Sequence, residues 1–444
     1  MKTWRSVLLI IVVCLGLVLP AEVAEAAFTS LPNDFDDQLV MGGVSSPTAI
    51  AWLPNGTLLA TSQSGRVFRQ NGTSATSILT LNAICSGGEM GLLGLAVDPK
   101  FGQSRPFVYL YYTHRRGGGC NEAKDRANRV SRFSMDGAQN LVPSSERVLI
   151  DNIAARGGNH NGGDLQFGRD GMLYVSIGDS GQDLNNGAGQ NGNGNARRLD
   201  LLNGKILRVT AEGVIPADNP FVGTGSTTCA ANGQARSADA GVHAEKKSKK
   251  KKKARKRKKR KQRRDRRNQN PPTGSICGEI FATGLRNPYR IAFDPDDTSG
   301  PQRFFINDVG GGAWEEIDDA VAGADYGWNL REGPCKVGST SNCAPDSRFT
   351  EPIHAYDRDD GCRVITGGAF VPNSSNWPSV RDTQYLFADM GCNRIFALDA
   401  NNPGAGAAVF ASGEGASHLA FGPDGALYYT AHGDGQVRRI AYAP

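Results

Sequence analysis

The sequence predicts an all-β fold, a six-bladed β-propeller that occupies the whole chain after a short leader. Two observations predict it. A pattern of strand, turn and strand recurs six times, and 56 of the 444 residues are glycine while no long stretch shows helical periodicity. Short antiparallel strands joined by tight turns build the blades of a propeller. An irregular β-sandwich is the alternative, but six evenly patterned turns over the chain favour the propeller.

Each repeat opens with a strand that ends in Phe, Val or Leu, passes a turn of Pro, Asp and Gly, and continues into a strand of alternating residues. A third strand carrying Arg or Lys usually follows. Because the loops on one face of a propeller converge on its central channel, side chains in those loops can reach a ligand. The six repeats begin at Thr48, Gly94, Asp164, Arg290, Gly367 and His418.

Residues 1–26 have the pattern of a secretory signal peptide. Lys2 and Arg5 precede the apolar run SVLLIIVVCLGLVL, and Ala24-Glu25-Ala26 offers a cleavage site between small residues. No other apolar run approaches the ~20 residues that span a bilayer. We therefore expect the mature protein, residues 27–444, to be soluble, without a transmembrane segment, and secreted to the periplasm or the extracellular space.

Eight of the nine cysteines lie beyond the leader, and none has Cys-x-x-Cys spacing. In an exported chain this pattern indicates disulfides rather than a metal site or redox thiols. The spacing alone leaves the connectivity open. We expect neighbours to pair, because each successive pair would then brace one loop: Cys85–Cys120, Cys229–Cys277, Cys335–Cys343 and Cys362–Cys392.

The net charge of +6 hides two opposite parts. Residues 246–267 contain 18 Lys or Arg and one Asp, so the rest of the chain carries −11. A block of like charges repels itself, and we expect the polybasic insertion at residues 245–272 to be disordered. It suits an anionic surface such as wall polymer, lipid headgroups or nucleic acid. It has no interleaved aromatics for specific nucleic-acid binding, and an insertion without a partner is the alternative.

His160 lies in a Gly/Asn turn, RGGNHNGGD, that offers it almost no apolar neighbours. We expect an exposed imidazole on a loop at the channel mouth, able to act as a base near neutral pH. Asp179 follows the next strand, at the other end of the same hairpin, where it would hold the second ring nitrogen. A structural role for this histidine is the alternative.

Two further loops carry groups for an anion and for a cation. Arg286, in GLRNP, has no acid close in sequence and would suit an anionic ligand such as a polycarboxylate; pairing with a surface acid is the alternative. In NDVGGGAWEEID, the glycines at 310–312 expose backbone carbonyls, and Glu315 and Glu316 add carboxylates. Such oxygens suit a hard cation such as calcium. A corner turn of a blade is the alternative.

Together these stretches resemble the soluble, quinone-dependent glucose/sorbosone dehydrogenase family, which includes aldose sugar dehydrogenases and hedgehog-interacting-protein-like propellers. The resemblance covers about residues 39–442. It is carried by NHNGGDLQFGRDGMLYVSIGD, GLRNPYRIAFDP, DVGGGAWEEID with DYGWN after it, and DGCRVITGGAF with FADMGCNRIFALD. It implies a six-bladed propeller that binds pyrroloquinoline quinone (PQQ) and calcium, oxidises a sugar at the anomeric carbon and passes electrons to an acceptor that the sequence does not identify.

The resemblance also implies a role for each matching residue. His160 is the base that takes the proton of the anomeric hydroxyl while hydride passes to the quinone, and Asp179 orients this base. The carbonyls of Gly310 and Gly311 hold the quinone-bound calcium. The positions that match cofactor-binding residues are Glu89, Arg286, Asn287 and Arg394.

Two positions depart from the best-characterised sugar dehydrogenases: Glu89 replaces a glutamine and Gly311 replaces a proline. Glu89 and the cysteines are similar to the hedgehog-interacting-protein-like branch. The second hypothesis is therefore a non-catalytic secreted propeller that binds glycan or protein through the same face. A metal-dependent lactonase ranks third, because it does not explain why His160 and Asp179 match the dehydrogenase pattern.

Overall fold

The computed structural model describes residues 28–229, 275–341 and 343–444. The predicted signal peptide and the predicted disordered insertion therefore lie outside the described residues. Strands make up most of the regular structure, which confirms the all-β prediction. The helical segments of the described part are short 3-10 turns at Ala123–Asp125, Pro143–Ser145, Gln190–Gly192, Asn195–Arg197, Ser379–Arg381 and Pro403–Ala405.

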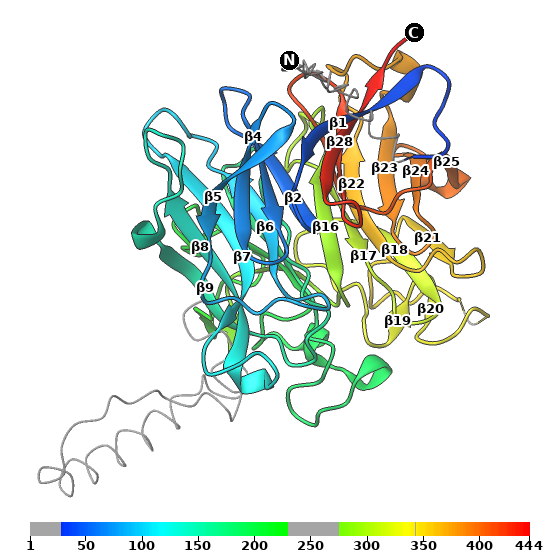
Figure 1. Ribbon diagram of the computed structural model, residues 1–444. Coiled ribbons are helices and arrows are strands. Elements are labelled where there is room, and N and C mark those ends of the chain that lie inside the picture. Colours follow the sequence, from blue (N-terminus) through cyan, green and yellow to red (C-terminus); the bar gives the residue numbers. More distant parts are fainter. Residues whose placement is uncertain (1–27, 230–274, 342) are drawn as a thin grey trace, which may run out of the picture.

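The sheets are arranged like a propeller, and the largest of them joins the two described ends of the fold (Figure 1). Its strand order is β2-β3-β4-β5-β1-β28-β27-β26, so it consists of two runs of four. Strand β1 lies antiparallel to β28 and meets β5 only at the pair Gly42–Ser74. The eight strands are β1 (Phe35–Gly42), β2 (Pro47–Trp52), β3 (Leu58–Ser62), β4 (Arg66–Asn71), β5 (Ser74–Thr80), β26 (Ala416–Phe421), β27 (Leu427–Ala431) and β28 (Gln436–Tyr442).

Four further sheets have four antiparallel strands each. Two are β6 (Leu92–Val97), β7 (Phe107–Arg115), β8 (Arg126–Ser134), β9 (Arg147–Ala154), and β10 (Leu165–Phe167), β11 (Leu173–Ile177), β12 (Lys205–Val209), β15 (Ile280–Thr283). The other two are β16 (Pro288–Phe293), β17 (Phe304–Asp308), β18 (Trp314–Asp319), β21 (His354–Asp357), and β22 (Ile365–Phe370), β23 (Gln384–Asp389), β24 (Arg394–Asp399), β25 (Ala407–Ser412). Small ribbons in the loops pair β13 (Ser226–Thr227) with β14 (Ile276–Cys277) and β19 (Arg331–Glu332) with β20 (Cys335–Lys336).

The first strands of successive four-strand runs contact one another in a closed ring. The ring runs through β2, β6, β10, β16, β22 and β26 and returns to β2. Each repeat start that the sequence predicts lies within two residues of the start of one of these strands. The periodic pattern in the sequence therefore marks the strands nearest the centre of the fold.

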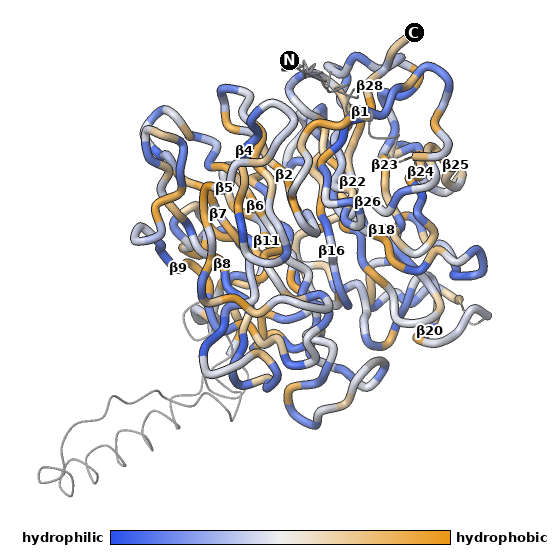
Figure 2. The backbone as a smooth tube through the Cα atoms, in the orientation of Figure 1, coloured by the Kyte–Doolittle hydropathy of each residue, from blue (hydrophilic) through white to orange (hydrophobic). Residues whose placement is uncertain are grey.

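Apolar side chains fill the space between neighbouring sheets. Each buried cluster draws its members from two adjacent four-strand runs. Because side chains alternate along a strand, the successive residues Ala49 and Ile50 of β2 pack in different clusters. Figure 2 shows apolar stretches along strands such as β7 and polar stretches in the loops at the strand ends.

Covalent and ionic links tie the loops and the ends of the fold. All four predicted disulfides form, Cys85–Cys120, Cys229–Cys277, Cys335–Cys343 and Cys362–Cys392, which confirms the predicted pairing of neighbours. Where β1 meets β28, Arg438 Nε donates to Asp37 Oδ1 over 3.0 Å, and both side chains are buried.

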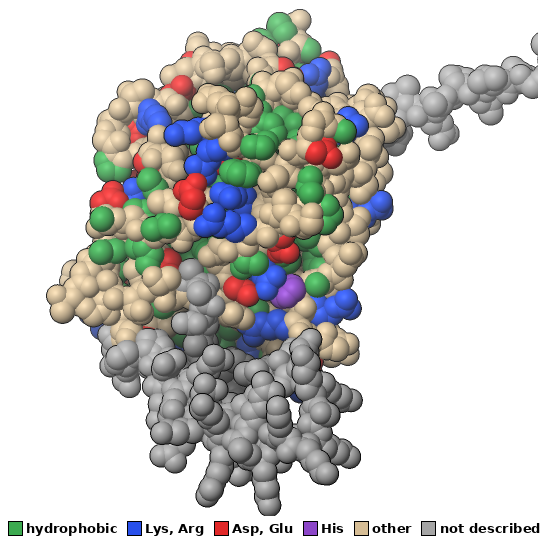
Figure 3. Space-filling model, turned by 90° about the vertical axis from the view of Figure 1, so that its left-hand side faces the viewer, with side chains coloured by type: hydrophobic (Ala, Val, Ile, Leu, Met, Phe, Trp, Pro, Cys, Tyr) green, Lys and Arg blue, Asp and Glu red, His purple; other side chains and the backbone are tan. Residues whose placement is uncertain are grey.

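The surface mixes charges of both signs. On the face shown in Figure 3, Lys and Arg side chains gather beside Asp and Glu side chains. Ion pairs such as Arg129–Asp151 and Arg303–Asp294 occur among the described residues. No helix in the described ranges is long and apolar enough to cross a membrane.

Candidate functional site

His160 and Asp179 lie at the same end of the β10–β11 hairpin. His160 is in the loop before β10, and Asp179 is two residues after β11 ends. The backbone of His160 is left-handed, with φ of 50°. Gly178 makes room for that loop, because a Cβ there would lie 2.1 Å from the carbonyl oxygen of His160. The Gly/Asn composition that singled out this loop in the sequence therefore reflects close backbone packing.

The two side chains form a buried hydrogen-bonded pair. His160 Nδ1 lies 2.7 Å from Asp179 Oδ1. The same carboxylate accepts the Gly181 N–H at 2.7 Å and the indole N–H of Trp328 at 2.8 Å. With an acceptor facing Nδ1, the imidazole donates from Nδ1 and keeps its lone pair on Nε2.

The predicted exposure of His160 is wrong. Its side chain is 5% exposed and that of Asp179 is 1% exposed. Loops of other sheets contact the hairpin end through Glu89, Arg286 and Trp328. The local sequence around His160 does not predict these contacts.

Glu89 and Asn287 hold the backbone of the His160 loop. Glu89 Oε2 accepts the His160 N–H at 2.7 Å and the Asn287 Nδ2–H at 3.1 Å. Asn287 Oδ1 in turn accepts the Gly162 N–H at 3.0 Å. These bonds join loops from three sheets into one network beside His160.

Arg286 lies next to this network and is buried. Its carbonyl accepts the Asp179 N–H at 2.8 Å, and its Nη1 donates to the Val309 carbonyl at 2.9 Å. The guanidinium carbon lies 5.4 Å from the centroid of the Trp328 ring. Within the described part of the chain, Arg286 Nε is buried and has no hydrogen-bond partner. It is a donor that a bound anion could satisfy.

The carbonyls of Gly310 and Gly311 face a guanidinium. Arg358 Nη2 donates to the Gly310 oxygen at 2.8 Å, and Arg358 Nη1 donates to the Gly311 oxygen at 3.4 Å. Arg358 Nη2 also pairs with Glu315, whose side chain is fully buried. The predicted calcium ligands are thus already in contact with a cation from the protein.

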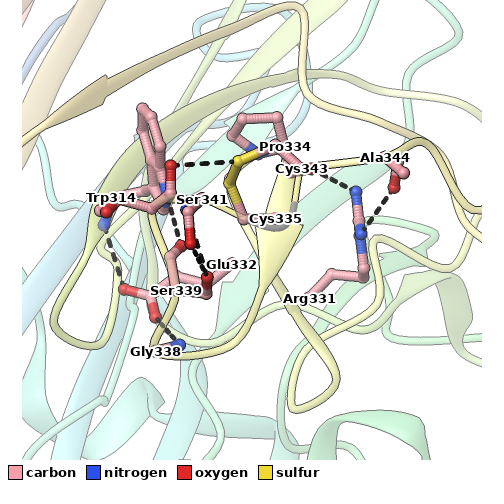
Figure 4. The surroundings of a disulfide bond; sticks show 12 residues. Trp314, Arg331, Glu332, Pro334, Cys335, Gly338, Ser339, Ser341, Cys343 and Ala344 are labelled. Atoms are coloured by element: carbon pink, nitrogen blue, oxygen red, sulfur yellow. Dashed lines mark hydrogen bonds between the residues drawn. A yellow bond between two sulfur atoms is a disulfide. The ribbon is translucent and has the colours of Figure 1, made fainter.

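Glu332 fixes the other side of this glycine loop. Its Oε1 accepts the N–H groups of four successive residues, at distances of 2.6 to 3.1 Å: Gly311, Gly312, Ala313 and Trp314. Figure 4 shows Glu332, in β19, close to Trp314 at the start of β18; the partner strand β20 carries Cys335 of the Cys335–Cys343 disulfide. The peptide N–H groups point to Glu332, and the carbonyls of Gly310 and Gly311 point to Arg358.

Arg394 lies apart from these groups. It begins β24, is one-third exposed, and its Nη1 is 3.9 Å from Asp360 Oδ2. Its described contacts do not include His160 or Arg286. The structure therefore brings together seven of the eight residues that the sequence predicts for the site, and the described contacts of Arg394 do not join it to them.

A carboxylate cluster contacts the backbone N–H of Arg286 through Asp308. It includes two residues that the sequence reasoning missed, Asp308 and Asp318. Ligand oxygens of Asp308, Glu316 and Asp318 lie within 4.8 Å of one another, and all three side chains are buried. Burial raises the pKa of Asp308 to about 7, and burial with mutual repulsion raises the pKa of Glu316 and Asp318 well above the usual range. Both carboxylate oxygens of Asp318 lack a hydrogen-bond partner among the described residues. The signal in the sequence was the i, i+2 spacing of Glu316 and Asp318, which places both on one face of β18.

A buried lysine also supports the site and was missed. Lys205 Nζ donates to the carbonyls of Asn195, Ala196 and Asn203 at 3.3, 2.6 and 2.7 Å. The side chain of Asn195 in turn donates to the Asp179 carbonyl at 2.9 Å. Burial lowers the pKa of Lys205 to about 7.

Comparison with known families and proteins adds to this geometry. The family model described as Glucose / Sorbosone dehydrogenase matches residues 44–231 and 266–439. Aldose sugar dehydrogenase YliI of Escherichia coli (strain K12) is 23% identical over 436 residues, which cover 96% of this chain and 97% of that protein. The HIPL2 protein of Arabidopsis thaliana is 26% identical over 363 residues, which cover 70% of this chain but only 44% of HIPL2.

A solved structure has the same fold. The PQQ-bound form of aldose sugar dehydrogenase from Streptomyces coelicolor aligns with a TM-score of 0.62 at 22% sequence identity. The alignment covers 93% of this chain and 99% of that one. At this identity the likeness concerns the arrangement of the strands.

Proposed function

Because the chain belongs to the glucose/sorbosone dehydrogenase family, we propose that it is a secreted, PQQ-dependent dehydrogenase that oxidises an aldose at the anomeric carbon. Residues 27–444 would form one six-bladed propeller that carries the polybasic insertion. The closed ring of first strands and the four-strand runs support this architecture. The sugar and the electron acceptor are left open.

The His160–Asp179 pair is the observation that carries the proposal. In this role, Nε2 of His160 takes the proton of the hydroxyl on the carbon that is oxidised. Asp179, 2.7 Å from Nδ1, holds the ring and stabilises the imidazolium that results. PQQ, when bound, supplies the acceptor for the hydride that leaves the same carbon. Proton and hydride together account for the two-electron oxidation of the sugar.

The residues around the pair fit an anionic cofactor. Arg286 would hold it, because its buried Nε has no partner in the described part and its charge suits a polycarboxylate. Asn287 and Glu89 use their side chains on one another and on the His160 loop. We therefore assign these two to positioning the base. Arg394, whose described partners are Asp360 and Cys362, has no role beside the base in this proposal.

Two sets of oxygens could serve as calcium ligands. The Gly310 and Gly311 carbonyls do not fit a cation as they stand, because Arg358 already donates to both. The carboxylates of Asp308, Glu316 and Asp318 do fit, since a hard cation prefers such oxygens and would relieve their repulsion. We assign calcium to this cluster, where it would stabilise the Asp308 carboxylate that accepts the Arg286 N–H.

Reconstitution tests the proposal directly. Purified protein is freed of metal with a chelator, mixed with PQQ and calcium, and assayed for dye reduction over a panel of aldoses. PQQ binding is measured separately by quenching of tryptophan fluorescence. We expect the wild type and the surface control Arg348→Met to bind PQQ and to oxidise an aldose. His160→Ala should bind PQQ without oxidising the sugar.

One observation favours a second candidate, the non-catalytic propeller that binds glycan or protein. Glu89 presents a carboxylate beside Asn287, where a quinone anion would approach. In that case PQQ would not bind under any metal condition. If the protein then binds on a glycan array and loses this binding when Arg286 is substituted, the non-catalytic binding propeller replaces the dehydrogenase proposal.

A further inference from the structure

The loop of residues 309–311 presents three successive carbonyls to two arginines. Arg286 Nη1 donates to Val309, and Arg358 donates to Gly310 and Gly311. The two arginines come from different loops, one before β16 and one after β21. This convergence places the positive charge of Arg358 where the sequence resemblance predicts a metal ion, with Arg286 on the neighbouring carbonyl.

We propose that Arg358 takes the place of a metal ion at the Gly310–Gly311 carbonyls, so that an anionic cofactor binds beside this loop without calcium there. The inference rests on the proposed function for the identity of the anion, and on the contacts of Arg358 for the identity of the cation.

Arg358 is held in this place by a buried carboxylate. Glu315 pairs with its Nη2, and Glu315 Oε2 accepts the Ile365 N–H at 3.0 Å. A metal ion on the carbonyls would displace the guanidinium and break its pair with a fully buried acid. Removing one partner of such a pair is costly, because the other charge stays buried.

The carbonyls themselves cannot turn away to accommodate another partner. Glu332 binds the N–H groups that follow Gly310, so each peptide of the loop has its N–H on one side and its oxygen on the other. A Cβ on Gly310 would lie 1.5 Å from the Trp314 carbonyl oxygen, which shows how closely the loop is packed. The loop is therefore preformed for the guanidinium.

Both arginines keep a donor free for a ligand. Within the described ranges, Arg286 Nε and Arg358 Nε are buried and have no hydrogen-bond partner. A buried donor without a partner calls for an explanation, and a bound anion would satisfy both of these donors. Two guanidinium groups that contact the same loop suit the carboxylates of a polycarboxylate anion.

Two measurements on chelator-treated, full-length protein test the inference. In the first, PQQ is titrated with and without calcium into the wild type, Arg358→Met and Arg348→Met. We expect Arg358→Met to weaken binding in chelator by roughly 10- to 100-fold, the range for a lost charge-assisted hydrogen bond. Arg348 is a matched control, because it is an exposed arginine paired with a neighbouring aspartate.

In the second measurement, Tb³⁺ replaces calcium and its luminescence, sensitised by tryptophan, is followed in the absence of PQQ. Arg358→Met frees two carbonyls and Glu315, so it should bind one more Tb³⁺ than the wild type, while its circular dichroism spectrum is unchanged. Equal Tb³⁺ stoichiometry in the two proteins, or a Kd of Arg358→Met for PQQ that equals the wild-type value in chelator, overturns the inference. Failure of every protein to bind PQQ overturns the proposed function instead, and the Tb³⁺ result still decides the role of Arg358.

Discussion

Replacement of Glu332 by glutamine should loosen the glycine loop without removing any apolar contact. The carboxylate oxygen Oε1 accepts four successive N–H groups, and Oε2 accepts the Gly338 N–H at 3.3 Å. Glutamine keeps an acceptor of the same size at the same place. Glutamine also places an amide N–H₂ donor where Oε2 accepts the Gly338 N–H, so the substitution removes the negative charge together with that one bond.

The number of donors and general hydrogen-bond energies give the free energy that the loop loses. A hydrogen bond to a charged group contributes about 1.5–3 kcal/mol and a neutral one about 0.5–1.5 kcal/mol. Four donors lose this difference, but they share one oxygen, so we expect a total loss of about 2–3 kcal/mol rather than the full sum. In the local opening equilibrium of the loop, that loss corresponds to roughly 30- to 150-fold.

Hydrogen exchange followed by mass spectrometry measures this quantity on the peptide that contains residues 311–314. In Glu332→Gln these amides should exchange roughly 30 to 150 times faster than in the wild type. Glu212→Gln serves as the control, because Glu212 is 42% exposed and pairs only with Arg105 among its described ion pairs. Exchange of residues 311–314 at the same rate in both variants would refute the reasoning.

Three further predictions concern the dyad, the buried lysine and the carboxylate cluster. His160→Ala should lower kcat by at least about 10²-fold, and Asp179→Asn by less, because the second leaves the base in place; equal losses in steady-state assays would contradict this order. The pKa of Lys205 is lowered to about 7 by burial, so the unfolded state binds more protons between pH 7 and the ordinary lysine pKa, and the free energy of unfolding should rise with pH by up to ~1.4 kcal/mol per unit. Urea unfolding at pH 7, 8 and 9 should show this slope in the wild type and not in Lys205→Met, and equal slopes would count against it. Asp318→Asn should weaken calcium binding in calorimetry by at least about tenfold, since one of three carboxylates loses its charge; unchanged binding would place the ion elsewhere.

The sequence predicted most of the fold because propeller repeats are local. Each strand-turn-strand unit carries its own alternation and turn residues, so the six starts could be located one at a time. The disulfides followed for the same reason, since neighbouring cysteines lie in loops of the same or adjacent units. The His160–Asp179 pair was predictable because both residues belong to one hairpin.

The rest of the site depends on contacts that no local pattern records. Arg358 reaches the Gly310 and Gly311 carbonyls from a loop 48 residues further along the chain. Glu89 contacts Asn287 across 198 residues of sequence. The burial of His160 likewise comes from loops of other sheets. A resemblance can suggest which residues meet, but it cannot say that an arginine occupies a predicted metal position.

The pairing of β1 with β28 has a consequence for how the protein is made. Asp37 and Arg438 form their buried ion pair across 401 residues of sequence. During synthesis, β1 emerges first and must wait for β28, so until then it is an edge strand without its main partner. Contacts of such long sequence separation form slowly, because the loop must close before they stabilise anything. The sheet that joins the two described ends can therefore close only after β28 has been synthesised. A chain stopped before β28 should be a substrate for chaperones and proteases.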